Sequence, residues 1–378
     1  MINGRLSFFI GFSALLLIAP VICYVIWGEQ LILQAYLGEE PDWLHKIIEI
    51  LYPRFFAEKN RLELSFFLAK VNQLVLRYAI VLIVVCVCYS LYETSHNFRK
   101  RLSGFTEIKT SIHNVYILRI LFFFILLVAT RDVYQDLKAL RHLSIFYSPV
   151  GILQLVHLPF PGQYASFLIY GILFLSSVLV IFGVRPVLFS VLAMGTFVIY
   201  QAYLYSFEKI DHGYAPFTYA CMLFPFLLRE REHAKKNDCI HFNSWSLQLI
   251  LIITCLVYFL SGLEKILISG VGWLSPVTFK TYLLLHDTVI GKKVASVEFL
   301  VVLFPALALL LQLSFPLMLF FRGLKYLILP AGLLFHIGTV ILFGISSFEN
   351  PWLFNYIFFF DWSGIGARLS FLPPYFRT

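Results

Sequence analysis

Charged side chains are scarce in this sequence of 378 residues. Asp, Glu, Lys and Arg together make up 13% of the chain, whereas hydrophobic residues make up 60% and the mean hydropathy is +0.83. Soluble domains carry about 25% charged residues, so this composition excludes a water-soluble globule. It predicts a polytopic membrane protein whose main partner is the lipid bilayer.

Acidic residues are fewer than basic ones, at 21 against 29, which gives a formal net charge of +8. In a soluble protein this balance would suggest nucleic-acid binding. In a membrane protein, Lys and Arg beside the spanning segments set the orientation of the chain. We therefore expect no nucleic-acid partner.

Metal-binding and disulfide motifs are also missing. The six cysteines form no Cys-x-x-Cys pair and no Cys/His spacing typical of a zinc site. His113, His157, His212 and His336 are scattered along the chain and form no i,i+4 pair. We expect neither a disulfide framework nor a metal or haem centre.

Long apolar runs are abundant, and a bilayer-spanning helix needs about 20 such residues. They predict an all-α architecture with nine membrane-spanning helices and a shorter tenth candidate. The short segment at 216–228 contains Pro216 and Pro225, so we expect it to be broken or tilted. The predicted spans are 7–27, 72–92, 114–130, 166–183, 187–205, 216–228, 245–262, 297–321 and 326–346, with 352–362 as the tenth candidate.

Lys and Arg are unevenly distributed between alternate loops. The loops at 94–112, 184–186, 229–244 and 322–325 hold 11 cations in 42 residues, whereas those on the opposite side hold 13 in 128. Because cytoplasmic loops are the ones enriched in Lys and Arg, we place the first set and the N-terminus in the cytoplasm. The longer loops then face the extracytoplasmic side of the cell membrane.

The chain is expected to have three parts. Residues 1–112 form an N-terminal two-span module that contains an extracytoplasmic helical hairpin or cap at 28–71 and a basic cytoplasmic linker at 94–112. Residues 113–350 form the main membrane domain, and residues 351–378 form a C-terminal tail.

Lys265 is the sharpest functional candidate, because ionisable groups near membrane depth are costly and are often functional. It ends the run Tyr258-Phe-Leu-Ser-Gly-Leu-Glu-Lys265 at the extracytoplasmic end of an apolar helix. Its side chain could simply extend to the interface. Burial could instead lower its pKa and make it a usable base.

Two histidines are further functional candidates besides Lys265. His212 lies in an extracytoplasmic turn on the same predicted side as Lys265, and His336 lies inside an apolar helix. An exposed turn histidine and a hydrogen-bonded core histidine are the plain alternatives for these two residues. A transporter is unsupported, because the later spans lack interior acids and no inverted repeat is visible.

Several of these segments resemble one membrane-protein family, the horizontally transferred transmembrane (HTTM) domain, which is the membrane domain of vitamin K-dependent gamma-carboxylase. The run from Tyr258 to Lys265 followed by Trp273 resembles its Y-F-x-[AS]-G-x-x-K…W signature. Leu118-Arg119-Ile120, Asp211-His212-Gly213-Tyr214 and Phe335-His336 with Phe343-Gly344-Ile345 resemble three further segments in the same order.

The resemblance implies a mechanism and a site. It implies that Lys265 deprotonates a quinol-like lipid, such as reduced vitamin K, at the extracytoplasmic face, and that His212 takes part in modifying a peptide or small substrate. Tyr258, Gly262, Trp273, Tyr214 and His336 are then expected to bind substrate or lipid. The alternative is a non-catalytic membrane protein that binds lipid or assists the maturation or export of a secreted peptide.

Overall fold

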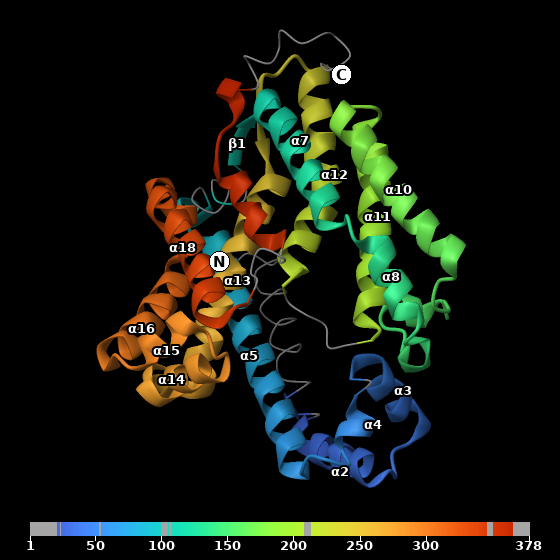
Figure 1. Ribbon diagram of the computed structural model, residues 1–378, viewed down its shortest axis with the longest axis vertical. Coiled ribbons are helices and arrows are strands. Elements are labelled where there is room, and N and C mark those ends of the chain that lie inside the picture. Colours follow the sequence, from blue (N-terminus) through green and yellow to red (C-terminus); the bar gives the residue numbers. More distant parts are fainter. Residues whose placement is uncertain are drawn as a thin grey trace. The chain divides into compact units, whose positions relative to one another are not determined.

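The computed structural model describes residues 21–365 apart from 23, 53, 100–104, 106–107, 208–212 and 346–350. The chain forms two compact units, Met1–Gly104 and Phe105–Thr378. The division falls inside the segment expected to be a basic linker. Figure 1 shows the helices of both units.

The first unit consists of short helices followed by one long one. Its elements are the π-helix η1 (Tyr24–Gly28), α2 (Glu29–Leu37), α3 (Asp42–Leu51), α4 (Phe55–Glu58) and α5 (Leu64–Thr94). A small core of Ala35, Phe55 and Phe67 joins α2, α4 and the first turn of α5. In the most apolar stretch of α5 the described residues are exposed or half-buried and none is fully buried, which is typical of a helix that faces lipid.

The second unit is a helical bundle with one small β-ribbon. Its elements in chain order are β1 (Ile108–Ser111), α7 (Ile112–Ala129), α8 (Val133–Arg141), η2 (Ser144–Phe146), α9 (Ile152–Leu155), α10 (Gln163–Phe182), α11 (Pro186–Tyr205), α12 (Ala215–Lys236), β2 (His241–Ser244), α13 (Trp245–Ser269), η3 (Gly270–Leu274), α14 (Pro276–Leu285), α15 (Val289–Ala295), α16 (Glu298–Ser314), α17 (Leu317–Phe320), η4 (Arg322–Leu324), α18 (Lys325–Phe343) and η6 (Pro351–Phe359).

The prediction of an all-α polytopic membrane protein is confirmed. Among the described residues, seven helices are long and apolar enough to cross a bilayer. They coincide with seven of the predicted spans and are Leu64–Thr94, Ile112–Arg141, Gln163–Phe182, Pro186–Tyr205, Trp245–Leu267, Glu298–Phe320 and Arg322–Phe343. Most of the predicted span at 7–27 lies outside the described residues.

Two predicted spans are not among these seven helices. The segment 216–228 lies within α12, whose second half is rich in charged residues, including Arg229, Glu230 and Arg231, and this helix is not among the seven. Most of the segment 352–362 belongs to the 3₁₀-helix η6, which has nine residues and ends at Phe359. At about 2 Å per residue such a helix is shorter than the bilayer core of about 30 Å.

The helices α10 and α11 form a tight antiparallel hairpin, and the sequence of the turn explains it. α10 ends at Gly183, whose φ of 80° is a left-handed conformation that glycine adopts without steric cost. Pro186 then occupies the first turn of α11, where its missing N–H is not needed. Only Gly183, Val184 and Arg185 connect the two helices.

A β-ribbon ties together the starts of two distant helices. β1 precedes α7 and β2 precedes α13, and the strands pair antiparallel from Ile108 opposite Ser244 to Ser111 opposite His241. Each strand ends in a serine whose hydroxyl accepts a hydrogen bond from its own helix. Ser111 Oγ accepts from Asn114 N at 3.1 Å, and Ser244 Oγ accepts from Leu247 N at 3.1 Å.

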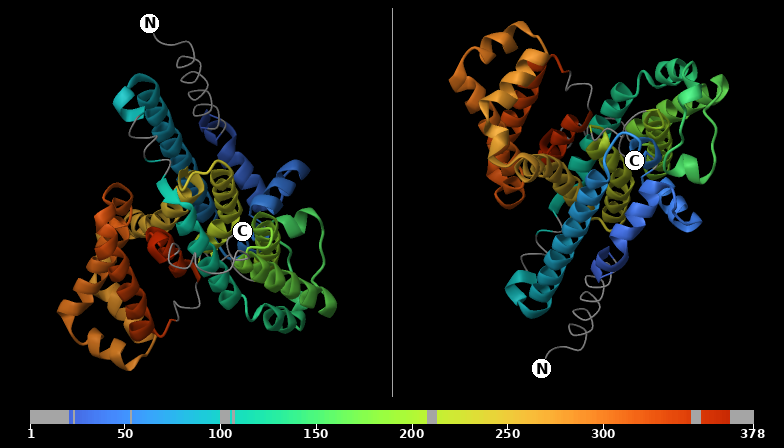
Figure 2. Two further views of the ribbon diagram at one scale, coloured as in Figure 1. Left: turned by 90° about the horizontal axis from the view of Figure 1, so that it is seen from above. Right: turned by 90° about the horizontal axis from the view of Figure 1, so that it is seen from below.

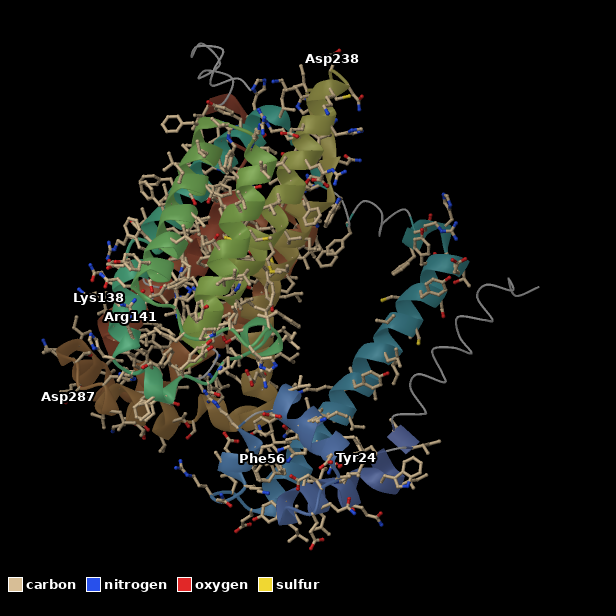
Figure 3. The ribbon with its side chains drawn as sticks, turned by 90° about the vertical axis from the view of Figure 1, so that its right-hand side faces the viewer. Tyr24, Phe56, Lys138, Arg141, Asp238 and Asp287 are labelled. Carbon is tan, nitrogen blue, oxygen red and sulfur yellow. The ribbon has the colours of Figure 1, made fainter. Side chains whose placement is uncertain are left out.

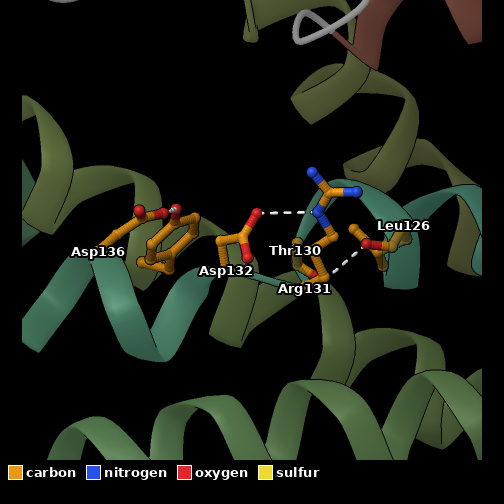
Figure 4. Close-up of polar contacts among 6 residues, drawn as sticks. Leu126, Thr130, Arg131, Asp132 and Asp136 are labelled. Carbon is orange, nitrogen blue, oxygen red and sulfur yellow. Dashed lines mark hydrogen bonds and ion pairs between the residues drawn. The ribbon is translucent and has the colours of Figure 1, made fainter.

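Polar contacts also shape the corner between α7 and α8 (Figure 4). Thr130 Oγ1 donates to Leu126 O at 2.6 Å, and Arg131 Nε donates to Asp132 Oδ2 at 2.9 Å. Asp136 on α8 accepts from Tyr200 Oη of α11 at 2.6 Å. The corner is therefore fixed both to α7 and to the neighbouring hairpin.

The two ends of the second unit carry loops expected on opposite sides of the membrane. Figure 3 shows Asp238, which follows α12, at one end of this unit, and Lys138, Arg141 and Asp287 toward the other. The alternation of loops thus agrees with the spans. The assignment of the Asp238 end to the cytoplasm stays a prediction.

Helices α14, α15, α16 and α18 gather at one side of the second unit, as Figure 2 shows from above and below. The helix α13 connects this group to the other helices of the second unit, because it packs against both α12 and α16. The candidate site is built around this central helix.

Replacing Ser244 by Ala tests the junction between α12, β2 and α13. Ser244 is fully buried, and its hydroxyl both caps α13 and donates to Glu230 Oε2 at 2.5 Å. We expect S244A to lower the free energy of unfolding by about 1–2 kcal/mol, because loss of a cap typically costs that much. Thermal unfolding in detergent measures it. Ser296→Ala at an exposed serine is the control, and an equal loss in both variants would contradict the role of Ser244.

Candidate functional site

The polar residues singled out on α13 lie on one face of that helix. Tyr258, Ser261, Gly262 and Lys265 are spaced at i, i+3, i+4 and i+7, which places them in a single stripe. Tyr258 and Lys265 are two turns apart, or about 10 Å along the axis. The stripe faces α16, because Gly262 lies against Gln312 and Tyr258 against Phe315.

Tyr258 is the centre of a buried polar cluster. Its Oη is hydrogen-bonded to His336 Nε2 of α18 at 2.8 Å and to the hydroxyl of Tyr356 in η6. Its ring stacks on Phe315, with centroids 3.5 Å apart and planes 13° apart. These four residues, called the Tyr258 cluster, bring together α13, α18, η6 and the end of α16. His336 is thus the hydrogen-bonded core histidine that the sequence left as one alternative.

Two glycines allow the helices around this cluster to approach closely. A Cβ on Gly262 would lie 3.1 Å from Gln312 Cβ and 3.2 Å from Leu313 Cδ2, so α13 and α16 are in tight contact there. A Cβ on Gly332 of α18 would collide with the hydroxyl of Tyr356 and lie 3.1 Å from Phe315 Cζ. Small residues at helix contacts in membranes serve this purpose.

Lys265 is half-buried, and its ammonium group has three identifiable contacts. Nζ donates to Ser261 O at 3.1 Å and to Ser261 Oγ at 2.9 Å, and it lies 5.2 Å from the centre of the Trp273 ring. A carbonyl oxygen, a hydroxyl oxygen and an aromatic face all favour the charged form of lysine. These contacts hold the Lys265 side chain in place beside Ser261 and Trp273.

Trp273 carries an unused hydrogen-bond donor. Its Nε1 is buried and has no hydrogen-bond partner among the described residues. A buried N–H without a partner costs free energy, so a ligand oxygen at this point would satisfy it. Lys265 and Trp273 therefore form one small polar site at the end of α13.

The remaining site residues expected from the sequence do not join this site in the described part of the chain. His212 lies outside the described residues. Tyr214 is half-buried and packs against the main hydrophobic core, and its carbonyl accepts from Thr218 Oγ1 at 3.0 Å. The pairing of Lys265 with His212 stays a prediction.

A large apolar cavity lies between α14, α16 and α18, with a volume of about 720 Å³. Aliphatic and aromatic side chains line it almost throughout, including Phe279 and Phe343. Lys265 and Trp273 are not among its lining residues. On α16 the cavity side, with Leu311 and Ser314, is next to the side that packs against α13, with Gln312 and Phe315.

Several important residues escaped the sequence analysis. Tyr356 and Phe315 carry no motif, and their partners lie far away along the chain. Nothing in the sequence distinguished Gly332 from the other glycines. Gln312 was visible as a polar residue in an apolar run, and its Oε1 is buried with no hydrogen-bond partner among the described residues. Of these four residues, Gln312 is the one that the sequence could have indicated.

The described residues contain no group of three His, Cys, Asp or Glu side chains placed to hold a metal ion. Comparisons of the chain with protein-family models, curated proteins and solved structures found no match.

Replacing Tyr258 by Phe tests the Tyr258 cluster. The ring keeps its place on Phe315, but His336 and Tyr356 each lose a buried hydrogen-bond partner. We expect the free energy of unfolding to fall by about 1–2 kcal/mol. Detergent unfolding curves measure this, with Tyr282→Phe at an exposed position of α14 as the matched control. Equal stability of Y258F and the parent chain would show that the cluster is not a structural support.

Proposed function

We propose that this integral membrane protein binds an uncharged lipid with a long hydrocarbon or isoprenoid chain. The observation that carries the proposal is the cavity of about 720 Å³ between α14, α16 and α18. Cavities of roughly 300–1,000 Å³ are typical of small-molecule sites. A space of this kind inside a membrane domain supports a lipid as the occupant.

The lining of the cavity selects against a charged ligand. Among its lining residues, only Ser314 and Thr339 carry side-chain hydroxyls, and none is charged. Both hydroxyls are already used by their own helices, since Ser314 Oγ donates to Leu311 O and Thr339 Oγ1 donates to His336 O, each at 2.8 Å. Burying a charged or strongly polar group here would cost several kcal/mol.

The cavity also has a route to its ligand. Lining residues such as Leu310, Leu327 and Leu334 are strongly exposed on the outside of the bundle. They belong to α16 and α18, both long and apolar enough to span the bilayer, so we expect them to contact lipid acyl chains. A hydrocarbon chain could enter sideways from the bilayer without crossing water.

Filling the cavity tests the binding proposal. Ala331→Trp places an indole inside the cavity, whereas Leu333→Trp adds the same side chain at an exposed position of the same helix that does not line it. We expect A331W to weaken binding of an isoprenoid quinone at least about tenfold, which corresponds to about 1.4 kcal/mol, and L333W to leave it unchanged. Equilibrium binding to purified protein in nanodiscs measures both variants.

A ring-free isoprenoid hydrocarbon serves as the second probe. If the cavity recognises the chain alone, A331W weakens the binding of both probes equally. Unchanged binding of both probes in A331W would contradict the proposal.

A second candidate function is the quinol chemistry of the HTTM family, which we propose on the residues of α13. It is favoured by the placement of Lys265 in one stripe with Tyr258 and Gly262, beside the unused N–H of Trp273. In this reaction Lys265 would take a proton from a quinol hydroxyl. For this step Lys265 must start as the neutral amine; the proton that it takes converts it to the ammonium form and leaves the quinol as its monoanion.

Lys265→Ala and Lys265→Arg separate this candidate from lipid binding. Arginine keeps the positive charge but cannot act as a base near neutral pH. The quinol chemistry predicts oxygen-dependent epoxidation by the parent protein and a loss of at least about 100-fold in both variants. The assay uses folded protein in nanodiscs with several quinols. Epoxidation that survives in K265R, or its absence in the parent, would contradict the base role and leave lipid binding.

A further inference from the structure

The helix α3 of the first unit is amphipathic with an unusually wide apolar side. At 100° per residue, its six apolar residues cover an arc of about 160°, and its four polar residues cover the opposite side. The apolar set is Trp43, Leu44, Ile47, Ile48, Ile50 and Leu51, and the polar set is Asp42, His45, Lys46 and Glu49.

Protein covers only part of this apolar arc. Leu44 and Ile48 are half-buried, and Ile48 packs against the small core of Ala35, Phe55 and Phe67. Trp43, Ile47 and Ile50 remain 54%, 44% and 60% exposed. These three residues, called the α3 apolar edge, form a continuous strip beside the core contact.

The opposite side of the helix is suited to water. His45 stacks on Phe56 with ring centroids 4.3 Å apart, and its Nδ1 is hydrogen-bonded to Glu40 Oε1 at 2.8 Å. This hydrogen bond lowers the pKa of Glu40, so the carboxylate stays ionised at neutral pH. Lys46 and Glu49 are both exposed.

The position of α3 in the chain indicates what covers its apolar edge. Only 12 residues, 52–63, separate α3 from α5, which is long and apolar enough to span the bilayer. Phe67 in the first turn of α5 belongs to the same small core that Ile48 contacts. That core fixes α3 at the end of a membrane-spanning helix, which is the depth of the lipid head groups.

We propose that α3 is an interfacial helix that inserts its apolar edge into the bilayer surface, with Trp43 at the level of the head groups. Aromatic residues with one apolar and one polar side are enriched at this depth. The inserted strip would hold the short helices α2, α3 and α4 at the surface and so limit rotation and sliding of α5.

The charges of α3 distinguish insertion from electrostatic attraction. The helix has one positive charge, on Lys46, and two negative charges, on Asp42 and Glu49. Its formal charge is therefore −1 when His45 is neutral. Helices drawn to anionic lipids are rich in Lys and Arg. We therefore expect α3 to bind through its apolar area and to show no preference for anionic lipid.

Quenching of Trp43 by brominated lipid is the first test. The full chain is placed in nanodiscs of phosphatidylcholine brominated near the top of the acyl chain, and the contribution of Trp43 is the difference between the parent and Trp43→Phe. We expect strong quenching that does not change when part of the lipid is phosphatidylserine or when salt is raised. Absence of quenching, or quenching that requires phosphatidylserine, would overturn the proposal.

A pair of cysteine variants supplies a second, independent readout. Ile47→Cys lies on the apolar edge, and Lys46→Cys lies one residue away on the polar side. A water-soluble maleimide should label Cys at position 46 at least about tenfold faster than at position 47, a ratio equivalent to about 1.4 kcal/mol. Labelling of the native cysteines is subtracted by using the parent chain.

The two readouts together identify other occupants. Equal labelling rates at positions 46 and 47 would mean that the edge is in water. Slow labelling at position 47 without quenching of Trp43 would mean that protein, such as a second copy of this chain, covers the edge. Either result would overturn the proposal.

Discussion

The hydroxyl group of Tyr258 is the interaction on which the second unit most depends. It lies in the middle of a membrane-spanning helix and is hydrogen-bonded to His336 of α18 and to Tyr356 of η6. No water is available at membrane depth to replace these partners, so polar groups there must be satisfied within the protein. One hydroxyl therefore fixes three segments that are distant in the sequence.

Close packing around this hydroxyl follows from two glycines and one ring. Gly262 brings α13 against α16, Gly332 leaves room for Tyr356, and Phe315 stacks on Tyr258. The same packing turns the other side of α16 toward α18, where the apolar cavity lies. A hydrogen-bonded polar cluster and an apolar cavity thus lie on neighbouring sides of α16.

The proposed functions follow from the contrast between these two regions. The cavity contains only satisfied hydroxyls and apolar surface, which suits a hydrocarbon chain. The end of α13 offers the Nζ group of Lys265 and, among the described residues, an unused N–H at Trp273, and both groups can donate hydrogen bonds to oxygen atoms. In the first unit, α5 and the α3 apolar edge leave their apolar surface to lipid, whereas the second unit has a large core of its own.

The sequence by itself determined the membrane class and seven of the spans, because a lipid solvent requires about 20 consecutive apolar residues per helix and this constraint is local. It also determined the stripe from Tyr258 to Lys265, since helical spacing alone places those residues on one face. The charges at the end of α12 and the shortness of η6 were visible in the sequence too, and they explain why neither is among the seven long apolar helices. Only the tertiary structure decided that Tyr356 and Phe315 meet Tyr258, that α16 and α18 enclose a cavity, and that β1 pairs with β2. Most of these contacts join segments that are far apart in the sequence, and local hydropathy carries no information about which distant side chains pack together.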